Sequence, residues 1–279
     1  MTTLAVPAQL LGEGMAGKVT FDAESLTDMC IRVKLDKLSG ILPEVSVDRF
    51  NTYGVVLLEL PEPPTVPQIL SMEESLGSIW YHQRSEESGI AVIEATGTPP
   101  GFLGTMSNNH PPHTDGAYSE NPPRIVLLAC EYAEVSGGES ILVSAATVHN
   151  NIRDMGGGLL ESLYAPDAVT ITRNGAIARK AVFAYTDGRV GICFRKDDYS
   201  TTQASETSTH AVRMLSEIIS TPDLQFRIRL GRGDVLLIDN SAILHGRIAF
   251  DAASGRRRML RANFMGKIDQ KFEFGFDAI

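Results

Sequence analysis

Apolar residues in this chain fall mostly into short runs separated by turn residues, a pattern typical of β-rich proteins. The clearest runs are YGVVLLEL (53–60), PPRIVLLACEYA (122–133), FRIRLGRGDVLLIDN (226–240) and RRRMLRANFMG (256–266). Segment 181–195 predicts a β-hairpin, because its Asp187-Gly188 pair lies between two β-rich arms and favours a tight turn.

Helical patterns are confined to three segments. Residues 65–77 are compatible with a helix, 145–164 look helical but are interrupted by three consecutive glycines, and 205–220 carry apolar residues at helical spacing. Strands therefore dominate. The fold class predicted is mainly β with inserted helices, a sandwich or jelly roll rather than a parallel α/β sheet. The P-loop pattern GxxxxGK[ST] does not occur, so that phosphate-binding loop is not expected.

Length and composition indicate an ordinary globular protein with 279 residues and a formal net charge of −9. We expect one domain over 1–279, with 1–44 as an N-terminal extension packed on it. The negative charge argues against a nucleic-acid partner. Three scattered cysteines, no secretory signal and no apolar run of membrane length predict a cytoplasmic protein that contacts no membrane. Its partner is then a small molecule; the oligomeric state is left open.

The stretch NNHPPHTDGAY (108–118) holds the most distinctive chemistry. In an extended segment, His113 and Asp115 share one face and Thr114 lies on the other. A third metal ligand is available from VLLIDNSAILHGR (235–247), where His245 follows an apolar strand. Two imidazoles and one carboxylate suit non-haem Fe(II) oxygenases, which need open positions on the metal. By spacing alone this is a weak signal, and ordinary histidines with satisfied hydrogen bonds explain the pattern better.

Two further features sharpen this interpretation. Arg257 follows His245 by twelve residues and shares a strand face with Arg261, and a guanidinium matches a carboxylate bidentately. Ser140 places a hydroxyl just after the Gly-Gly turn of SGGES. The order HTD, GGES, DNSAILHG and RRRMLRA resembles the taurine dioxygenase/clavaminate synthase-like family of Fe(II)- and 2-oxoglutarate-dependent oxygenases. The resemblance covers about residues 45–268 and is concentrated in these four blocks.

The resemblance implies a double-stranded β-helix (jelly roll) and assigns roles by position. The expected iron ligands are His113, Asp115 and His245. The expected contacts to 2-oxoglutarate are Arg257, Ser140 and Arg261, and the positions that often face the substrate are Asn109 and Tyr118. Because Arg256, Arg257 and Arg258 are adjacent, a one-residue slip would change which of them faces inward; the block order favours Arg257. His110 is expected to face away from His113 and to be structural.

The implied reaction uses Fe(II), 2-oxoglutarate and O₂, and releases succinate and CO₂ while oxidising an unactivated C–H bond. The substrate expected is an amino acid or an intermediate of secondary metabolism. Because Asp115 is present, hydroxylation is expected rather than chlorination; desaturation and ring closure stay open. The basic stretch 173–196 is a candidate site for a substrate carboxylate. The alternatives are a cupin-like jelly-roll metalloenzyme that uses no 2-oxoglutarate, and a non-catalytic 2-oxoglutarate sensor.

Overall fold

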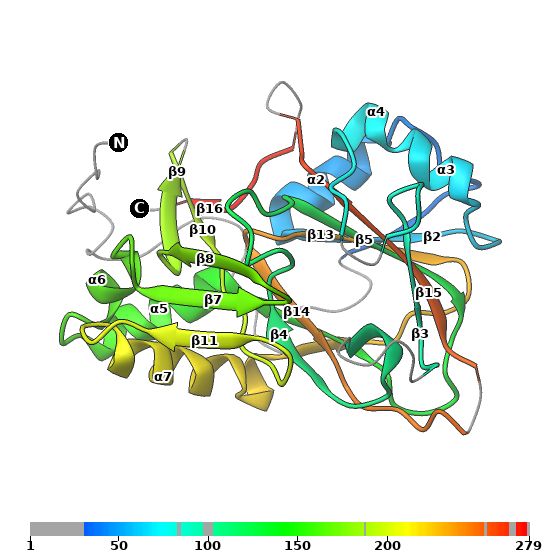
Figure 1. Cartoon of the computed structure of the whole chain (residues 1–279). Helices are drawn as coiled ribbons and strands as arrows, with labels where there is room; N and C mark the ends of the chain where they lie inside the picture. Colours follow the sequence, from blue (N-terminus) through cyan, green and yellow to red (C-terminus); the bar gives the residue numbers. More distant parts are fainter. Residues whose placement is uncertain are drawn as a thin grey trace.

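Strands dominate the computed structural model, which describes residues 31–82, 85–96, 103–186, 188–253, 256–267 and 272–277 (Figure 1). The largest sheet has six strands, in the order β1 (Arg32–Lys34), β2 (Val55–Glu59), β13 (Asp234–Asp239), β5 (Ile125–Tyr132), β15 (Arg258–Phe264) and β3 (Ala91–Glu94). All neighbours in it are antiparallel except β1 and β2. The expectation of a mainly β chain is confirmed.

A second sheet packs against the first and carries the predicted site. Its four antiparallel strands are, in order, β12 (Phe226–Ile228), β6 (Ser140–Ser144), β14 (Ile243–Arg247) and β4 (His110–His113). One apolar cluster joins Leu57, Val126 and Leu236 of the large sheet to Leu142 and Phe226 of the small one. The two sheets therefore form a two-layer sandwich.

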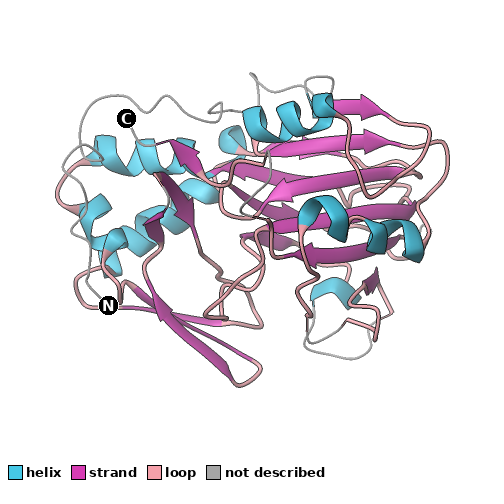
Figure 2. Ribbon diagram, turned by 90° about the horizontal axis from the view of Figure 1, so that it is seen from above, coloured by secondary structure: helices cyan, strands magenta, loops and turns pink. Residues whose placement is uncertain are grey.

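Helices cover the outer face of the large sheet (Figure 2). They are α2 (Glu44–Tyr53), α3 (Val66–Ser71) and α4 (Glu73–Leu76). Phe50 and Met72 of this layer pack with Val235 and Leu237, whereas Leu236 joins the cluster between the sheets. Because both faces of β13 are buried, its sequence is a continuous apolar run rather than an alternating one.

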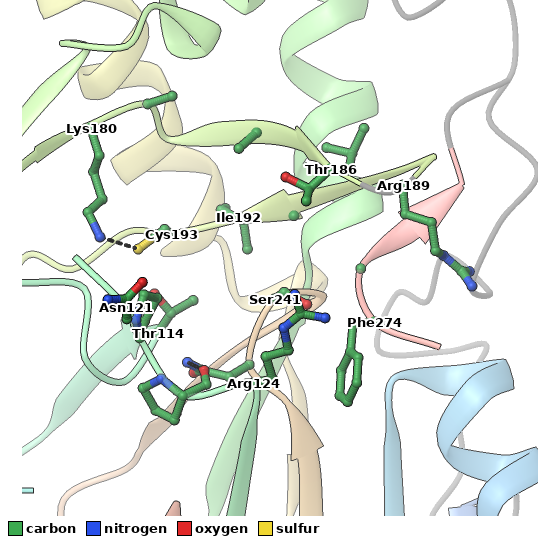
Figure 3. A pocket seen from close by; sticks show the side chains of 18 of the residues that line it. Thr114, Asn121, Arg124, Lys180, Thr186, Arg189, Ile192, Cys193, Ser241 and Phe274 are labelled. Atoms are coloured by element: carbon green, nitrogen blue, oxygen red, sulfur yellow. Dashed lines mark hydrogen bonds between the residues drawn. The ribbon is translucent and has the colours of Figure 1, made fainter. Parts of the chain in front are cut away.

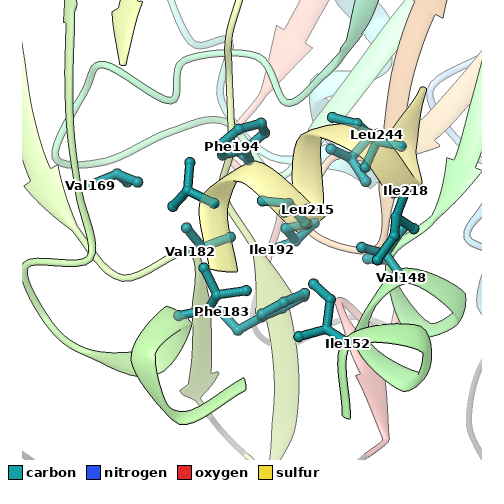
Figure 4. Close-up of a cluster of buried hydrophobic side chains, with 14 of the residues drawn as sticks. Val148, Ile152, Val169, Val182, Phe183, Ile192, Phe194, Leu215, Ile218 and Leu244 are labelled. Carbon is teal, nitrogen blue, oxygen red and sulfur yellow. The ribbon is translucent and has the colours of Figure 1, made fainter. Parts of the chain in front are cut away.

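The segment between β6 and β12 forms an inserted layer with its own core (Figure 4). Its strands form one three-stranded sheet and, together with the C-terminal strand β16, a second one, and helices pack on them. The sheets are β11 (Thr201–Ala204)–β7 (Val169–Arg173)–β8 (Ala176–Lys180) and β16 (Phe276–Asp277)–β10 (Arg189–Ile192)–β9 (Phe183–Thr186). The helices are α5 (Ala145–Met155), α6 (Leu159–Tyr164) and α7 (Thr209–Ile219), and a 3₁₀ turn, η3 (Pro222–Leu224), follows α7. Another 3₁₀ turn, η2 (Leu103–Thr105), lies outside this layer, before β4.

Several local predictions are confirmed. Strands β9 and β10 pair with Arg189 opposite Thr186, as the Asp-Gly hairpin requires, and the glycines at 156–158 separate α5 from α6. The expected extension 1–44 is described only from residue 31 onward; there, β1 pairs with β2 at the edge of the large sheet. Among the described residues, the structure has no helix long and apolar enough to cross a membrane.

Candidate metal centre

The three predicted ligands meet in the small sheet, at the ends of two neighbouring strands. His113 ends β4 and lies directly opposite His245 of β14, and Asp115 follows two residues later. The Nε2 atoms of His113 and His245 are 3.4 and 3.9 Å from the Asp115 Oδ1 atom. All three residues are buried, and one ligand atom from each lies within 4.8 Å of the others. The structure thus brings together all three.

The donor set fits Fe(II). The Nδ1 atom of His113 is 2.9 Å from the Pro111 carbonyl oxygen. Because a carbonyl oxygen only accepts hydrogen bonds, Nδ1 carries the proton and Nε2 keeps its lone pair. That Nε2 is buried and has no hydrogen-bond partner among the described residues. Two imidazole nitrogens and one carboxylate oxygen are the ligands typical of non-haem iron.

The Asp115 carboxylate is oriented by two residues of β15. Arg261 Nη1 lies 3.2 Å from Oδ2, and Asn263 Nδ2 donates to the same oxygen at 3.1 Å. Oδ1 is left facing the imidazoles. Asn240 fixes the backbone: its Oδ1 accepts from Asp115 N at 2.8 Å, and its Nδ2 donates to the Asp115 and Pro123 carbonyls. Asn240 lies inside the DNSAILHG block and Asn263 directly follows the RRRMLRA block, yet spacing gave no sign of their roles.

Electrostatics keep the three side chains in the protonation states that bind metal. Burial lowers the pKa of His245 to about 3. Burial, followed by the nearby Arg195 guanidinium, lowers the pKa of His113. Burial alone would raise the pKa of Asp115, but Arg261 and the neighbouring imidazoles outweigh it and hold that pKa well below its usual value. At neutral pH the cluster therefore offers two neutral imidazoles and one carboxylate.

A glycine lets the two ligand strands approach each other. A Cβ at Gly246 would lie 2.4 Å from the His110 carbonyl oxygen, and the register of β14 and β4 shifts at this point. The shift also moves His110: its ring stacks on that of His113 with centroids 4.0 Å apart. The expectation that His110 faces away from His113 is therefore wrong, because the irregular pairing changes the simple alternation.

Of the three adjacent arginines, Arg257 is the buried one. Its Nε atom is 2.9 Å from the Glu134 carboxylate, whose side chain is also buried. Arg256 is exposed and pairs with Glu94, and Arg258 pairs with Glu131. A bulge between Arg258 and Met259 breaks the register in β15, so alternation along the strand could not identify the inward arginine. The role of Glu134 as the partner of Arg257 was not predicted from the sequence.

Ser140, another predicted cosubstrate contact, is linked to Arg257 through Arg247 and Phe250. Ser140 is buried and pairs with Arg247 across β6 and β14. Arg247 and Arg257 both lie against the Phe250 ring, 4.9 and 5.5 Å from its centroid. Burial and the Arg257 charge lower the pKa of Arg247 to about 9. Arg257 and the Ser140 hydroxyl are thus candidates to bind a carboxylate, whereas Arg247 Nη2 already donates to the Met106 and Asn108 carbonyls.

The two predicted substrate contacts, Tyr118 and Asn109, differ in burial and in hydrogen bonding. Tyr118 is buried near the metal cluster, and its hydroxyl has no hydrogen-bond partner among the described residues. Burial and the negative charge of Asp115 raise its pKa. Asn109 is exposed, and its Oδ1 accepts from Ala249 N at 2.6 Å, which ties the loop before β4 to the loop after β14. The structure does not bring Asn109 to the cluster, so its role stays a prediction without structural support.

The basic stretch 173–196 divides between two places. Arg173 and Arg195 are buried on the side of the metal cluster. Arg179 and Lys180 instead line a cavity of about 1010 Å³ on the other side of the His-Thr-Asp segment, where Thr114 also points (Figure 3). Lys180 there donates to the Ser119 carbonyl oxygen. Only part of the stretch therefore faces the candidate site.

A two-layer β-sandwich with a buried His-Asp-His cluster defines a metal-binding β protein with the donor set of non-haem iron enzymes. Sequence comparison gives the family. The profile described as "Taurine catabolism dioxygenase TauD, TfdA family" matches residues 16–263, so the chain belongs to this family and is a dioxygenase. Membership favours the oxygenase over both the cupin-like alternative and the non-catalytic sensor.

Individual relatives are distant. A 3-((Z)-2-isocyanoethenyl)-1H-indole synthase from Fischerella ambigua (strain UTEX 1903) is 24% identical over 270 residues, covering 80% of this chain and 96% of that protein. Asparagine oxygenase in complex with Fe(II), 2S,3S-3-hydroxyasparagine and succinate superposes with a TM-score of 0.62 at 18% identity, covering 76% and 74% of the two chains. PvcB, an Fe, alpha-ketoglutarate dependent oxygenase from an isonitrile synthetic pathway, gives 0.58 at 18% identity and 81% coverage of both chains. At these identities the structures show a shared fold.

Proposed function

We propose that this protein is an Fe(II)- and 2-oxoglutarate-dependent oxygenase that oxidises an unactivated C–H bond of a small molecule with O₂. The buried cluster of His113, Asp115 and His245 carries the proposal, because its ligand atoms converge in the protonation states that bind iron. The superposed structures include complexes with Fe(II) and with alpha-ketoglutaric acid, which supports the same cofactors here. The sandwich of a large and a small antiparallel sheet supports a jelly roll, in a single domain.

Each residue of the site has a separate task in this proposal. His113, Asp115 and His245 hold the iron, with Arg261 and Asn263 orienting the carboxylate. When bound, iron and 2-oxoglutarate supply an oxidant for the substrate C–H bond and yield succinate and CO₂.

The cosubstrate is held at the other end of the site. Arg257 binds the distal carboxylate of 2-oxoglutarate beside Ser140, and Glu134 orients the guanidinium through Nε. This leaves both terminal nitrogens of Arg257 to form the paired hydrogen bonds that a carboxylate accepts.

The substrate class proposed is an amino acid or a natural-product intermediate. Two of the structural relatives support it: one is an asparagine oxygenase, and the other is an oxygenase from an isonitrile synthetic pathway. Asp115 occupies a ligand position that halogenases leave open for chloride, so hydroxylation, desaturation or ring closure is expected rather than chlorination. Tyr118 is the stronger of the two predicted substrate contacts, because it is buried and its hydroxyl has no hydrogen-bond partner among the described residues.

The test is an anaerobic titration of the metal-free protein with Fe(II) and 2-oxoglutarate, following the visible charge-transfer band of the chelate. Wild type should develop the band, His113→Ala should not, and Arg257→Ala should need at least about tenfold more 2-oxoglutarate. Two matched controls should behave as wild type: His210→Ala, an exposed histidine of α7, and Arg256→Ala, the exposed neighbour of Arg257.

Succinate release with a substrate panel then tests turnover. If folded wild type forms no band, the oxygenase proposal is wrong and a metalloenzyme without 2-oxoglutarate takes its place. If the band forms but no conditions release succinate, a 2-oxoglutarate sensor takes its place.

A further inference from the structure

A second group of buried charges lies beside the metal cluster and comes from the inserted layer. Arg173 ends β7, and Arg195 and Asp197 follow β10. The Asp197 carboxylate is shared by both arginines: Arg195 Nη2 is 2.6 Å from Oδ2, and Arg173 Nη1 is 3.4 Å from both oxygens. The side chains of all three are at most 5% exposed.

This group adjoins the candidate iron ligands. Arg195 Nη1 lies 3.9 Å from Asp115 Oδ1, and Arg195 Nη2 contacts His110 Nε2 at 3.3 Å. Arg173 lies over the ring of Tyr118, 5.9 Å from its centroid. The two arginines and the tyrosine thus lie around one region next to Asp115, and none of the three lines the cavity of Figure 3.

The group has spare capacity to bind an anion. Two guanidinium groups share one carboxylate, and Asp115, the other acid nearby, already faces Arg261. Among the described residues, the Tyr118 hydroxyl and the Arg195 Nε are buried without a hydrogen-bond partner. Burial and the repulsion from Arg195 lower the pKa of Arg173, as expected for excess positive charge. Buried charges and donors without partners are costly, and an anionic ligand group satisfies all of them.

We propose that Arg173, Arg195 and Tyr118 bind the carboxylate of the substrate, which is therefore an amino acid or an amino-acid derivative. The inference rests on the proposed function for what happens beside the metal, but the anion site stands on its own contacts. A planar guanidinium with free N–H groups matches a carboxylate bidentately, and the tyrosine hydroxyl supplies a third donor. Because Arg173 and Arg195 belong to the inserted layer, they set specificity separately from the two sheets that hold the cluster.

The test measures binding by calorimetry under anaerobic conditions, with Fe(II) and 2-oxoglutarate present. The probes are the 20 standard L-amino acids, taurine, and the decarboxylated amine of each amino acid that binds. We expect at least one amino acid to bind and its amine to bind at least about tenfold more weakly. Arg173→Gln should weaken the amino acid about 10- to 100-fold. Arg179→Gln, an exposed arginine of the same basic stretch that pairs with Asp167, should leave it unchanged.

Tyr118→Phe separates a binding role from a structural one. Since the hydroxyl has no partner among the described residues, its removal should leave the melting temperature unchanged or raise it, while amino-acid affinity falls. A tyrosine that only packs in the core would change neither affinity nor selectivity. Arg173→Lys keeps the charge and should recover part of the affinity, which guards against a folding defect in Arg173→Gln.

Each outcome decides a different point. If the charge-transfer band forms but no amino acid binds, or if amines bind as well as their amino acids, the inference is overturned and the oxygenase proposal stands. Tight binding of taurine alone would mean a sulfonate head group instead of a carboxylate and would equally overturn it. If no band forms but an amino acid binds in a manner that depends on Arg173, the anion site is supported and the oxygenase proposal fails.

Discussion

Asn240→Ala tests whether one amide side chain holds the metal-binding segment in place. Asn240 lies in the turn between β13 and β14 and is buried. It forms three hydrogen bonds of 2.8–2.9 Å: one from Asp115 N, and two to the carbonyls of Asp115 and Pro123. Alanine removes all three at once and leaves three buried backbone groups to find other partners.

The magnitude follows from these contacts. A hydrogen bond contributes about 1 kcal/mol net to stability, and a buried group left unpaired costs about 1–3 kcal/mol. Water can enter the space left by the amide and restore part of the loss. We therefore expect the free energy of unfolding to fall by about 3 kcal/mol, which is a large share of the ~5–15 kcal/mol typical of a domain. Fe(II) affinity should fall about 10- to 100-fold, as for other residues that orient metal ligands.

The assay is urea unfolding of the metal-free protein, with an Fe(II) titration alongside. The matched control is Asn151→Ala on α5, whose side chain makes one hydrogen bond, to the Thr147 carbonyl; it should lose about 1 kcal/mol and bind Fe(II) normally. A loss within about 0.5 kcal/mol of wild type for Asn240→Ala, or undiminished Fe(II) affinity, would refute the reasoning, because the three bonds would then neither stabilise the fold nor position Asp115.

Two further predictions concern packing and pH. Gly246→Ala places a Cβ 2.4 Å from the His110 carbonyl oxygen, so it should cost about 1–3 kcal/mol by urea unfolding and weaken Fe(II) binding; Gly231→Ala, where the new Cβ meets only Asp234 at 3.6 Å, should do neither. Burial lowers the pKa of His149 from 6.5 to about 4. Because the unfolded chain alone takes up a proton in that range, stability should fall by up to about 1.4 kcal/mol per pH unit as pH drops from 6.5 to 4. His149→Phe should remove that part of the slope in urea unfolding from pH 7 to 4; an unchanged slope would contradict the assignment.

Short sequence signals predicted those elements that are determined by residues close together in the chain. The Asp187-Gly188 pair predicted the β9–β10 hairpin, and the glycines at 156–158 predicted the break between α5 and α6. The β7–β8 hairpin was missed although it has the same kind of turn: Asn174 and Gly175 both have positive φ, as a type I′ turn requires. The arms of the β7–β8 hairpin are less apolar than those of the β9–β10 hairpin, so the pattern of hydrophobic residues did not reveal its strands.

Only those residues of the candidate site that belong to short sequence motifs could be predicted. His113 and Asp115 are two residues apart, and the four ordered blocks led to His245. The groups that orient them are not visible in this way: Asn240 is 125 residues from Asp115 in the chain, and Asn263 is 148 residues away. Such contacts depend on strand register, which a bulge changes without any sign in hydrophobic spacing.

The same long-range contacts explain how a metal can enter this site with little rearrangement. Arg261 and Asn263 hold Oδ2 of Asp115, whereas Oδ1 already faces the two imidazoles. Burial keeps the imidazoles of His113 and His245 neutral, so no proton has to leave them near pH 7. A metal held by the three side chains would leave both contacts to Oδ2 in place and would add positive charge to a region that already contains Arg195 and Arg261. In the proposed function that added charge favours an anionic cosubstrate and an anionic substrate, because unpaired positive charge in a buried site is costly.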